Sequence, residues 1–204
     1  MRDTLIIVPM KDPERAKSRL ADTLSPLARA RLAERFYRRT LAFLAPLAPR
    51  LGADVAVVTG SARCRAIAAE FGVPSIDEGQ VETLSDAVGR AAAWAAERGY
   101  SRICVIPADL ATPDGADLET LLAMEAPLVV CPSADRGTNA LLVSPPTAIP
   151  FRYGPASAAR HLSEGEAAGI VGVLLPLESL SLDVDTSACL ARARALAPDL
   201  EVAP

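Results

Sequence analysis

The sequence is poor in the residues that build metal clusters and thiol chemistry. It has one histidine, and no two of its four cysteines form a Cys-x-x-Cys pair. Structural zinc sites and Cys/His dyads need several of these residues at short spacing, so neither is favoured. We expect buried thiols at Cys64, Cys104, Cys131 and Cys189.

Long hydrophobic runs and an excess of positive charge are also missing. The 21 Lys and Arg are outnumbered by 25 Asp and Glu, which argues against a general nucleic-acid or anionic-membrane surface. No segment reaches the roughly 20 apolar residues that span a bilayer, and the opening MRDTLIIVPM has no small-residue cleavage site. We therefore expect a cytoplasmic protein without nucleic-acid or membrane partners, in which any basic site is local.

What the sequence does contain is an alternation of apolar β-branched runs and helix-like stretches. With 204 residues, 50% of them hydrophobic, the chain can bury one substantial core, so residues 1–204 are expected to form a single domain. The alternation indicates an α/β fold whose sheet is covered on both faces. The expected strands are 5–9, 54–59, 102–107 and 128–131, and the expected helices are 26–47, 62–71, 84–98 and 114–124.

The regular alternation of strands and helices ends after residue 132. A strand is expected at 139–143, a helix from about Pro155, a last strand near 181–184, and a closing helix over 186–196 with Thr186 as its N-cap. This part predicts strands inserted beside the main sheet. An exposed apolar helix face would favour a homodimer, but no interface can be read from one sequence.

The stretch VPMKDPERAKSRL, residues 8–20, is an apolar strand that runs into a loop with four cations, Lys11, Arg15, Lys17 and Arg19. Ligands of open α/β sheets bind beyond the carboxyl ends of the strands, so Lys11 is placed to meet a ligand. Solvated surface charges explain an isolated cluster of this kind equally well. Other features must decide between the two interpretations.

Acidic residues follow two other segments. Asp109, in IPADLATP, comes after the third apolar strand and therefore shares a sheet edge with Lys11. Magnesium usually takes one or two carboxylates plus substrate phosphates, and LDVDT supplies Asp183 and Asp185 as partners. For that pair alone, an acidic start to the last helix is the better interpretation.

The motif ADRGTNALLV places a glycine directly before two hydrogen-bonding side chains at a strand start. Gly137 lets the backbone approach a ligand closely, and Thr138 and Asn139 supply hydrogen bonds. An ordinary turn explains the motif equally well.

The motif FRYGPASAARHL predicts an anion site at a helix start. Pro155 after Gly154 is expected at the first helical position, which leaves free N–H groups near Ser157 for a phosphate or carboxylate. Arg160 and His161 lie three and four residues further on, on the same helical face.

The segments VPMKDPERAKSRLA, PADL, GTNALL, FRYGPASAARH and LDVDT occur in this order, and nearly the whole chain resembles the 2-phospho-L-lactate or phosphoenolpyruvate guanylyltransferases of coenzyme F-420 biosynthesis. The resemblance implies a nucleotidyltransferase with a Rossmann-like three-layer α/β/α sandwich and a mixed, mostly parallel sheet. It also implies that the phosphate of a three-carbon acid (2-phospho-L-lactate, phosphoenolpyruvate or 3-phosphoglycerate) attacks the α-phosphorus of GTP and releases pyrophosphate, with Mg²⁺ as the cofactor.

The resemblance assigns roles to individual residues. The implied nucleotide contacts are Pro9, Lys11, Lys17, Arg19, Ser85 and Asp86. The implied catalytic residues are Lys11, Lys17 and Asp109. The implied metal ligands are Asp109 and Asp185, with Asp183 as their neighbour. The implied contacts to the acid are Thr138, Asn139, Gly154, Ser157 and His161, whereas Arg15 falls at a variable position.

The chain departs from the family's pattern at TLSDAV, where relatives carry a GLNxAL-like stretch near the nucleotide. Ser85 and Asp86 stand there instead of a glycine-flanked asparagine, and ADLA lacks the usual proline after DL. An aspartate beside a triphosphate opposes binding unless it points away or takes part in recognition. Two alternatives therefore stay open: a non-catalytic nucleotide-binding relative, and a transferase that uses another nucleotide or acceptor.

Overall fold

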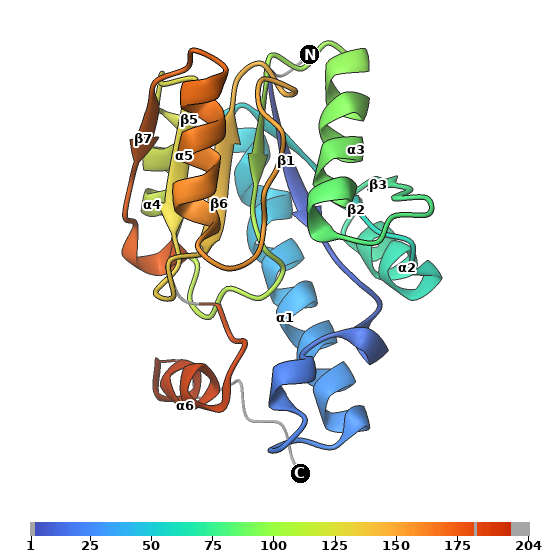
Figure 1. The fold of residues 1–204 in the computed structure, drawn as a ribbon. Coiled ribbons are helices and arrows are strands. Elements are labelled where there is room, and N and C mark those ends of the chain that lie inside the picture. The colour runs from blue at the N-terminus through green and yellow to red at the C-terminus, as the bar shows by residue number, and fades with distance from the viewer. Residues whose placement is uncertain (1–2, 182, 197–204) are drawn as a thin grey trace.

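A seven-stranded sheet in the order β3-β2-β1-β4-β6-β5-β7 forms the centre of the protein (Figure 1). The computed structural model describes residues 3–181 and 183–196. The strands are β1 Thr4–Pro9, β2 Ala53–Val58, β3 Ser75–Ile76, β4 Arg102–Val105, β5 Leu128–Pro132, β6 Thr138–Val143 and β7 Gly172–Leu174. Only β6 runs antiparallel to its neighbours β4 and β5. The predicted mixed, mostly parallel sheet is confirmed.

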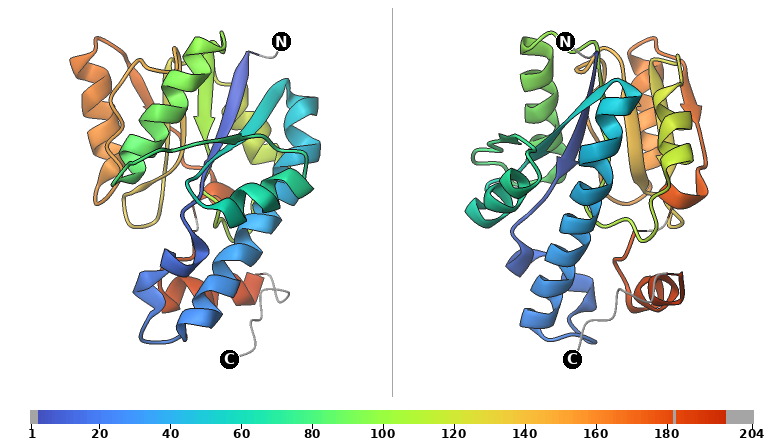
Figure 2. Two further views of the ribbon diagram at one scale, coloured as in Figure 1. Left: turned by 90° about the vertical axis from the view of Figure 1, so that its right-hand side faces the viewer. Right: turned by 180° about the vertical axis from the view of Figure 1, so that it is seen from behind.

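Helices cover both faces of this sheet (Figure 2). One face packs against α1 (Pro26–Leu47), α2 (Ala62–Glu70) and α4 (Gly115–Leu122), and the other packs against α3 (Leu84–Glu97) and α5 (Ser157–Ala167). In β1, Ile6 and Val8 belong to the first core and Leu5 and Ile7 to the second. Successive strand side chains point to opposite faces, so a strand buried on both sides is apolar throughout. The predicted three-layer α/β/α sandwich is confirmed.

A third group of buried residues lies beyond the end of the sheet. It joins α6 (Ser187–Leu196) to the first half of α1 and to the short 3-10 turn Ser18–Leu20. Its largest buried members are Phe36 and the leucines Leu20, Leu32 and Leu190. Figure 1 shows α6 below the sheet, near the start of α1. The basic loop 10–19 runs between this group and the sheet edge.

Capping residues explain where several helices begin. The Ser25 hydroxyl accepts a hydrogen bond from the Ala28 N–H at 3.2 Å, and Pro26 occupies the first turn of α1. Thr186 accepts from the Cys189 N–H, also at 3.2 Å, at the start of α6. The predicted N-cap of the last helix is therefore confirmed.

The prediction of a strand near 181–184 is wrong for those of its residues that the structure describes. Asp183 forms only an isolated bridge with Leu110, and residue 182 lies outside the described residues. The edge strands β3 and β7 were not predicted, because two or three residues are too short to show a period of two.

Three of the four cysteines are buried as expected, whereas Cys189 is half-buried, and all four are free thiols. Within the described ranges, no helix has both the length and the apolar character needed to cross a membrane.

Candidate functional site

A cavity of about 1230 Å³ opens at the carboxyl-terminal edge of the sheet. Its walls come from the segments that follow β1, β2 and β4, from the start of α3 and from the loop before α5. Open α/β sheets bind ligands at this edge. The sequence-predicted site residues that line the cavity are Pro9, Lys11, Lys17, Arg19, Ser85, Asp109, Gly154 and Asp185.

Lys17 joins two carboxylates at the floor of the cavity. Its Nζ donates to Asp109 Oδ2 and, at 3.2 Å, to Asp185 Oδ1, and its side chain is only 4% exposed. Burial lowers the pKa of Lys17, but the negative charges of Asp109 and Asp185 and their hydrogen bonds outweigh that effect, so the pKa lies above its ordinary value. Lys17 is therefore a buried cation at neutral pH.

Asp183 lies close to the same group. Burial, followed by the negative charges of Asp109 and Asp185, raises the pKa of Asp183 to about 6. The Asn139 side-chain amide donates to Asp183 Oδ1 at 3.5 Å. The bridge between Leu110 and Asp183 brings the LDVDT segment to the segment after β4. Acidic residues from two distant parts of the chain thus meet at one place.

The chemistry of this donor set fits a divalent ion that is shared with a ligand. Among the residues with described positions, no three carboxylate, histidine or cysteine side chains converge as a metal centre. Asp109 and Asp185 nevertheless both reach a single cation, the Lys17 ammonium. Magnesium prefers hard oxygen ligands and usually takes one or two carboxylates together with water and phosphate oxygens. Two convergent carboxylates beside a loop that carries exposed cations meet that requirement.

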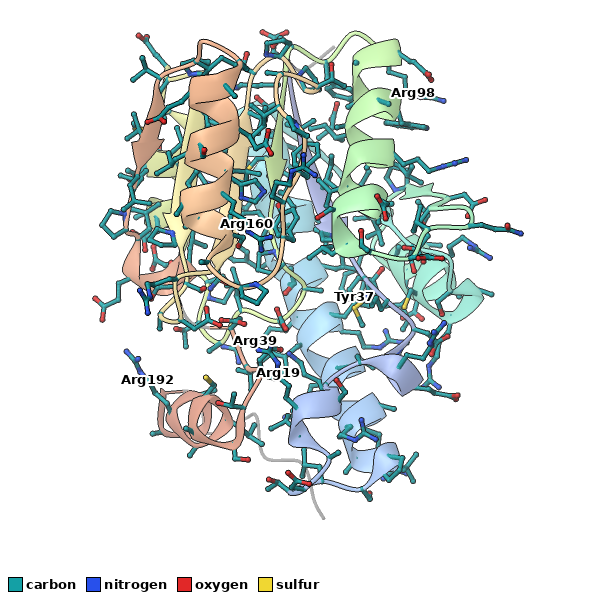
Figure 3. All side chains as sticks on the ribbon, in the orientation of Figure 1. Arg19, Tyr37, Arg39, Arg98, Arg160 and Arg192 are labelled. Atoms are coloured by element: carbon teal, nitrogen blue, oxygen red, sulfur yellow. The ribbon has the colours of Figure 1, made fainter. Side chains whose placement is uncertain are left out.

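The loop that carries the other cations is anchored at its base. Asp12 accepts hydrogen bonds from the Glu14 N–H at 3.0 Å and from the Ser61 hydroxyl at 2.9 Å. Lys11 and Arg19 are exposed along the cavity, and Arg19 Nη1 lies 3.8 Å from Asp185 Oδ2. Figure 3 shows Arg19 in the space between the sheet and α6. The loop is thus held at Asp12 while Lys11 and Arg19 line the cavity.

Three of the predicted contacts to the acid, Thr138, Ser157 and His161, form a hydrogen-bonded chain next to Gly154, and of the five predicted contacts only Gly154 lines the cavity itself. Thr138 Oγ1 lies 3.0 Å from His161 Nδ1 and accepts a hydrogen bond of 3.0 Å from the Ser157 hydroxyl. The Arg152 backbone N–H donates to His161 Nε2 at 2.9 Å. His161 is 0% exposed, so both of its ring nitrogens are used inside the protein.

Burial makes His161 a neutral imidazole over a wide pH range. Desolvation, followed by the positive charge of Arg160, lowers the pKa of His161 to about 4, while Glu164 acts in the opposite direction. The folded pKa is depressed, so the stability that comes from a neutral His161 is present above the unfolded pKa of about 6.5 and is lost as the pH falls toward 4.

Lowering the pH from about 7.5 to about 5 is expected to destabilise the wild-type protein by about 2 kcal/mol more than the His161→Gln variant. The variant has no imidazole to protonate, and all carboxylates titrate in both proteins. Urea unfolding at the two pH values measures the difference. Equal pH dependence in both proteins would show that His161 is not held neutral by the fold.

The start of α5 differs from its prediction. Ser157 rather than Pro155 is the first helical residue, and Ala156 before it has a φ of 53°. The Ser157 N–H donates to the Gly154 carbonyl at 3.1 Å, and the Ala158 N–H donates to the Arg136 carbonyl at 3.4 Å. The expectation of free N–H groups at the helix start is therefore wrong at these two positions, because the preceding turn and a neighbouring loop supply acceptors.

The TLSDAV segment forms the first turn of α3. Asp86 Oδ2 accepts from the Thr83 N–H at 3.2 Å and from the Thr83 hydroxyl at 2.6 Å, which completes a capping box. Ser85 Oγ accepts from the Tyr153 N–H at 3.0 Å and lines the main cavity, whereas Asp86 lines a neighbouring cavity of about 690 Å³. The helix cap thus holds Asp86 away from the main cavity, and its contact with a nucleotide stays a prediction.

The cavity residues that were not predicted from the sequence include Gly60, Ser61 and Glu78. Glu78 Oε1 accepts a hydrogen bond of 2.8 Å from the Gly60 N–H, and Ser61 caps α2 beside them. Gly60 and Ser61 follow β2. The rule that ligands bind beyond the ends of parallel strands could therefore have identified them. Glu78 follows the two-residue β3, for which the hydrophobic pattern contains no signal.

Known proteins with similar sequences are guanylyltransferases. The family described as "Guanylyl transferase CofC like" matches residues 4–193. The 3-phospho-D-glycerate guanylyltransferase of Colwellia psychrerythraea is 38% identical over 186 residues, which cover 90% of this chain and 87% of that protein. The phosphoenolpyruvate guanylyltransferase of Conexibacter woesei is 34% identical over 189 residues, which cover 90% and 83%.

Solved structures share the fold at low sequence identity. A putative nucleotide-diphospho-sugar transferase from Desulfovibrio desulfuricans G20 has a TM-score of 0.72 at 19% identity and covers all of both chains. Glucosyl-3-phosphoglycerate synthase from Mycobacterium tuberculosis, in complex with Mn²⁺ and uridine diphosphate, has a TM-score of 0.60 at 16% identity over 86% of this chain and 71% of that chain. These structural similarities show the fold alone. The family is shown by the sequence matches. The chain belongs to the CofC-like guanylyl transferase family.

Proposed function

We propose that this protein transfers GMP from GTP to a phosphorylated three-carbon acid and releases pyrophosphate. The observation that carries the proposal is Lys17, a buried cation held by Asp109 and Asp185 beside a basic loop, in a cavity at the ligand-binding edge of the sheet. The first acceptor to test is 3-phospho-D-glycerate, because the 38% identical relative is named for it. Phosphoenolpyruvate and 2-phospho-L-lactate, for which other relatives are named, are the remaining candidates.

The reaction needs positioning and charge neutralisation more than proton transfer. A phosphate oxygen of the acid attacks the α-phosphorus of GTP, a new P–O bond forms, and the bond to the β-phosphate oxygen breaks. The nucleophile is already an anion, so no general base is needed. Lys11, Lys17 and Arg19 bind the triphosphate and neutralise the charge that develops on the departing pyrophosphate.

Mg²⁺ is the proposed cofactor. Asp109 and Asp185 would hold it, with Asp183 close to both, and its chemistry would be to withdraw charge from phosphate oxygens. The raised pKa of Lys17 supports this assignment, because the charges of the same two carboxylates favour a cation beside them.

The acid is proposed to bind at the other end of the cavity, near Thr138, Asn139, Gly154 and Ser157. Gly154 lines the cavity with a φ of 117°, a conformation that strongly favours glycine. A Cβ at this position would lie 3.2 Å from Arg160 Nη2, and Arg160 reaches the loop from α5 (Figure 3). The φ angle and the close approach of Arg160 therefore both favour glycine at this point of the cavity wall.

Pyrophosphate release tests the proposed function. The purified protein with Mg²⁺ is given GTP, CTP, ATP or UTP in combination with each of the three acids, and mass spectrometry identifies the product. We expect release with GTP and at least one acid. The absence of pyrophosphate release with GTP and all three acids would contradict the proposal. Nucleotide binding without pyrophosphate release would favour a non-catalytic relative.

A transferase with a different nucleotide is the second candidate function. It is favoured by the TLSDAV departure, because Ser85 lines the cavity where relatives carry another residue pattern. Release with CTP, ATP or UTP in place of GTP would support this candidate.

A further inference from the structure

We propose that His161 is a positioning residue that orients the Thr138 hydroxyl, so that the proton of this hydroxyl points at the acid substrate. This inference rests on the proposed function and names a part of its acceptor site. His161 itself is 0% exposed and cannot touch the substrate. It acts through Thr138, which is half-buried at the start of β6.

The hydrogen bonds determine which nitrogen of His161 carries its proton. The Arg152 backbone N–H can only donate, so Nε2, which it meets at 2.9 Å, must be the unprotonated acceptor. The neutral ring then carries its proton on Nδ1 and donates it to Thr138 Oγ1 at 3.0 Å. The Tyr153 ring packs edge-on against the imidazole, with 5.0 Å between centroids, and restricts its rotation.

The Thr138 oxygen therefore receives two hydrogen bonds. One comes from His161 Nδ1 and the other from the Ser157 hydroxyl at 3.0 Å. A hydroxyl has two acceptor lone pairs and one proton, so the two donors fill both lone pairs. The remaining proton needs an acceptor, and both partners of Thr138 Oγ1 within the described residues are donors. A phosphate or carboxylate oxygen of the substrate supplies that acceptor.

The backbone explains why Thr138 can face α5. Thr138 pairs with Pro132 and Ala140 pairs with Cys131, so Asn139 is the extra residue of a bulge. A bulge redirects the neighbouring side chain, and here Thr138 turns toward His161 on α5, although Ala140 and Leu142 face the opposite core.

The hydrogen bonds of Ser157 place Thr138 beside the cavity. The Ser157 hydroxyl donates to Thr138 Oγ1, and the Ser157 backbone N–H donates to the carbonyl of Gly154, which lines the cavity. The Thr138 hydroxyl is therefore at the edge where the acid is proposed to bind.

Two substitutions of His161 separate positioning from packing. Asparagine retains a donor near the Nδ1 position, and glutamine retains an acceptor near the Nε2 position but has no donor for Thr138. With 3-phospho-D-glycerate, GTP and Mg²⁺, His161→Gln is expected to raise the KM for the acid about tenfold, as Thr138→Val should. His161→Asn is expected to stay within about twofold of wild type, and the KM for GTP should not change in any variant.

A purely structural role would affect both His161 variants alike and both substrates together. Equal KM values for the acid in His161→Asn and His161→Gln, at similar thermal stability, would overturn the proposal. The double variant Thr138→Val/His161→Gln should be no worse than Thr138→Val alone, because His161 acts through that hydroxyl.

A spectroscopic test does not depend on turnover. The chain has one histidine, so ¹⁵N NMR of the untagged protein reports a single imidazole. We expect a protonated Nδ1 and an unprotonated Nε2, and the opposite tautomer would overturn the inference whatever the enzyme does. Absence of wild-type turnover with all three acids would count against the proposed function instead, and the tautomer would still test the hydrogen bond from His161 to Thr138 separately.

Discussion

Asp109→Asn is expected to lower pyrophosphate release by at least about 1000-fold while the protein stays folded. The Asp109 carboxylate holds the Lys17 ammonium and is one of the two proposed ligands of Mg²⁺. Charge stabilisation by a metal ion is worth several kcal/mol of barrier, and about 4 kcal/mol corresponds to a 1000-fold change in rate. Steady-state release of pyrophosphate at saturating GTP measures the effect.

The control is Asp22→Asn, which removes the same charge from an exposed site outside the cavity. This variant should turn over at the wild-type rate. Thermal unfolding and circular dichroism of Asp109→Asn establish that the fold survives. Normal turnover in the folded Asp109→Asn variant would exclude the proposed role of this carboxylate.

Lys17→Met is expected to have two opposite effects. Turnover should fall by about 100- to 1000-fold, because a preorganised cation no longer neutralises the triphosphate. Binding of Mn²⁺ in the absence of nucleotide should become at least about tenfold tighter. In the wild-type protein the Lys17 ammonium is hydrogen-bonded to both Asp109 and Asp185. Its removal leaves both carboxylates available to a metal ion. Titration followed by electron paramagnetic resonance measures the affinity for Mn²⁺.

Lys11→Met is the matched control for this variant. Lys11 lines the same cavity but is exposed, so its loss should lower turnover and leave the affinity for Mn²⁺ within about twofold of wild type. An unchanged or weaker Mn²⁺ affinity in Lys17→Met would show that the carboxylates and the ammonium do not hold a shared charge site.

The sequence alone determined the elements whose causes are local. The apolar runs that became β1, β2 and β4 were predicted to within a few residues, because strands buried on both faces are apolar throughout. The caps at Ser25 and Thr186 act within three residues of themselves. The rule that ligands bind beyond the strand ends also predicted that Lys11 and Asp109 would share an edge, and both line the cavity.

Only the tertiary structure decided the contacts between residues far apart in the chain. Lys17 meets Asp185 across 168 positions, and no local pattern indicates that its ammonium lies between two carboxylates rather than in solvent. The orientation of Asp86 was decided by the cap of α3, and the start of α5 by acceptors from a neighbouring turn and loop. Motifs predict which residues gather at the sheet edge. Burial and hydrogen-bond geometry, which arise only when the segments pack together, determine which of them are charged, which are neutral and which face the ligand.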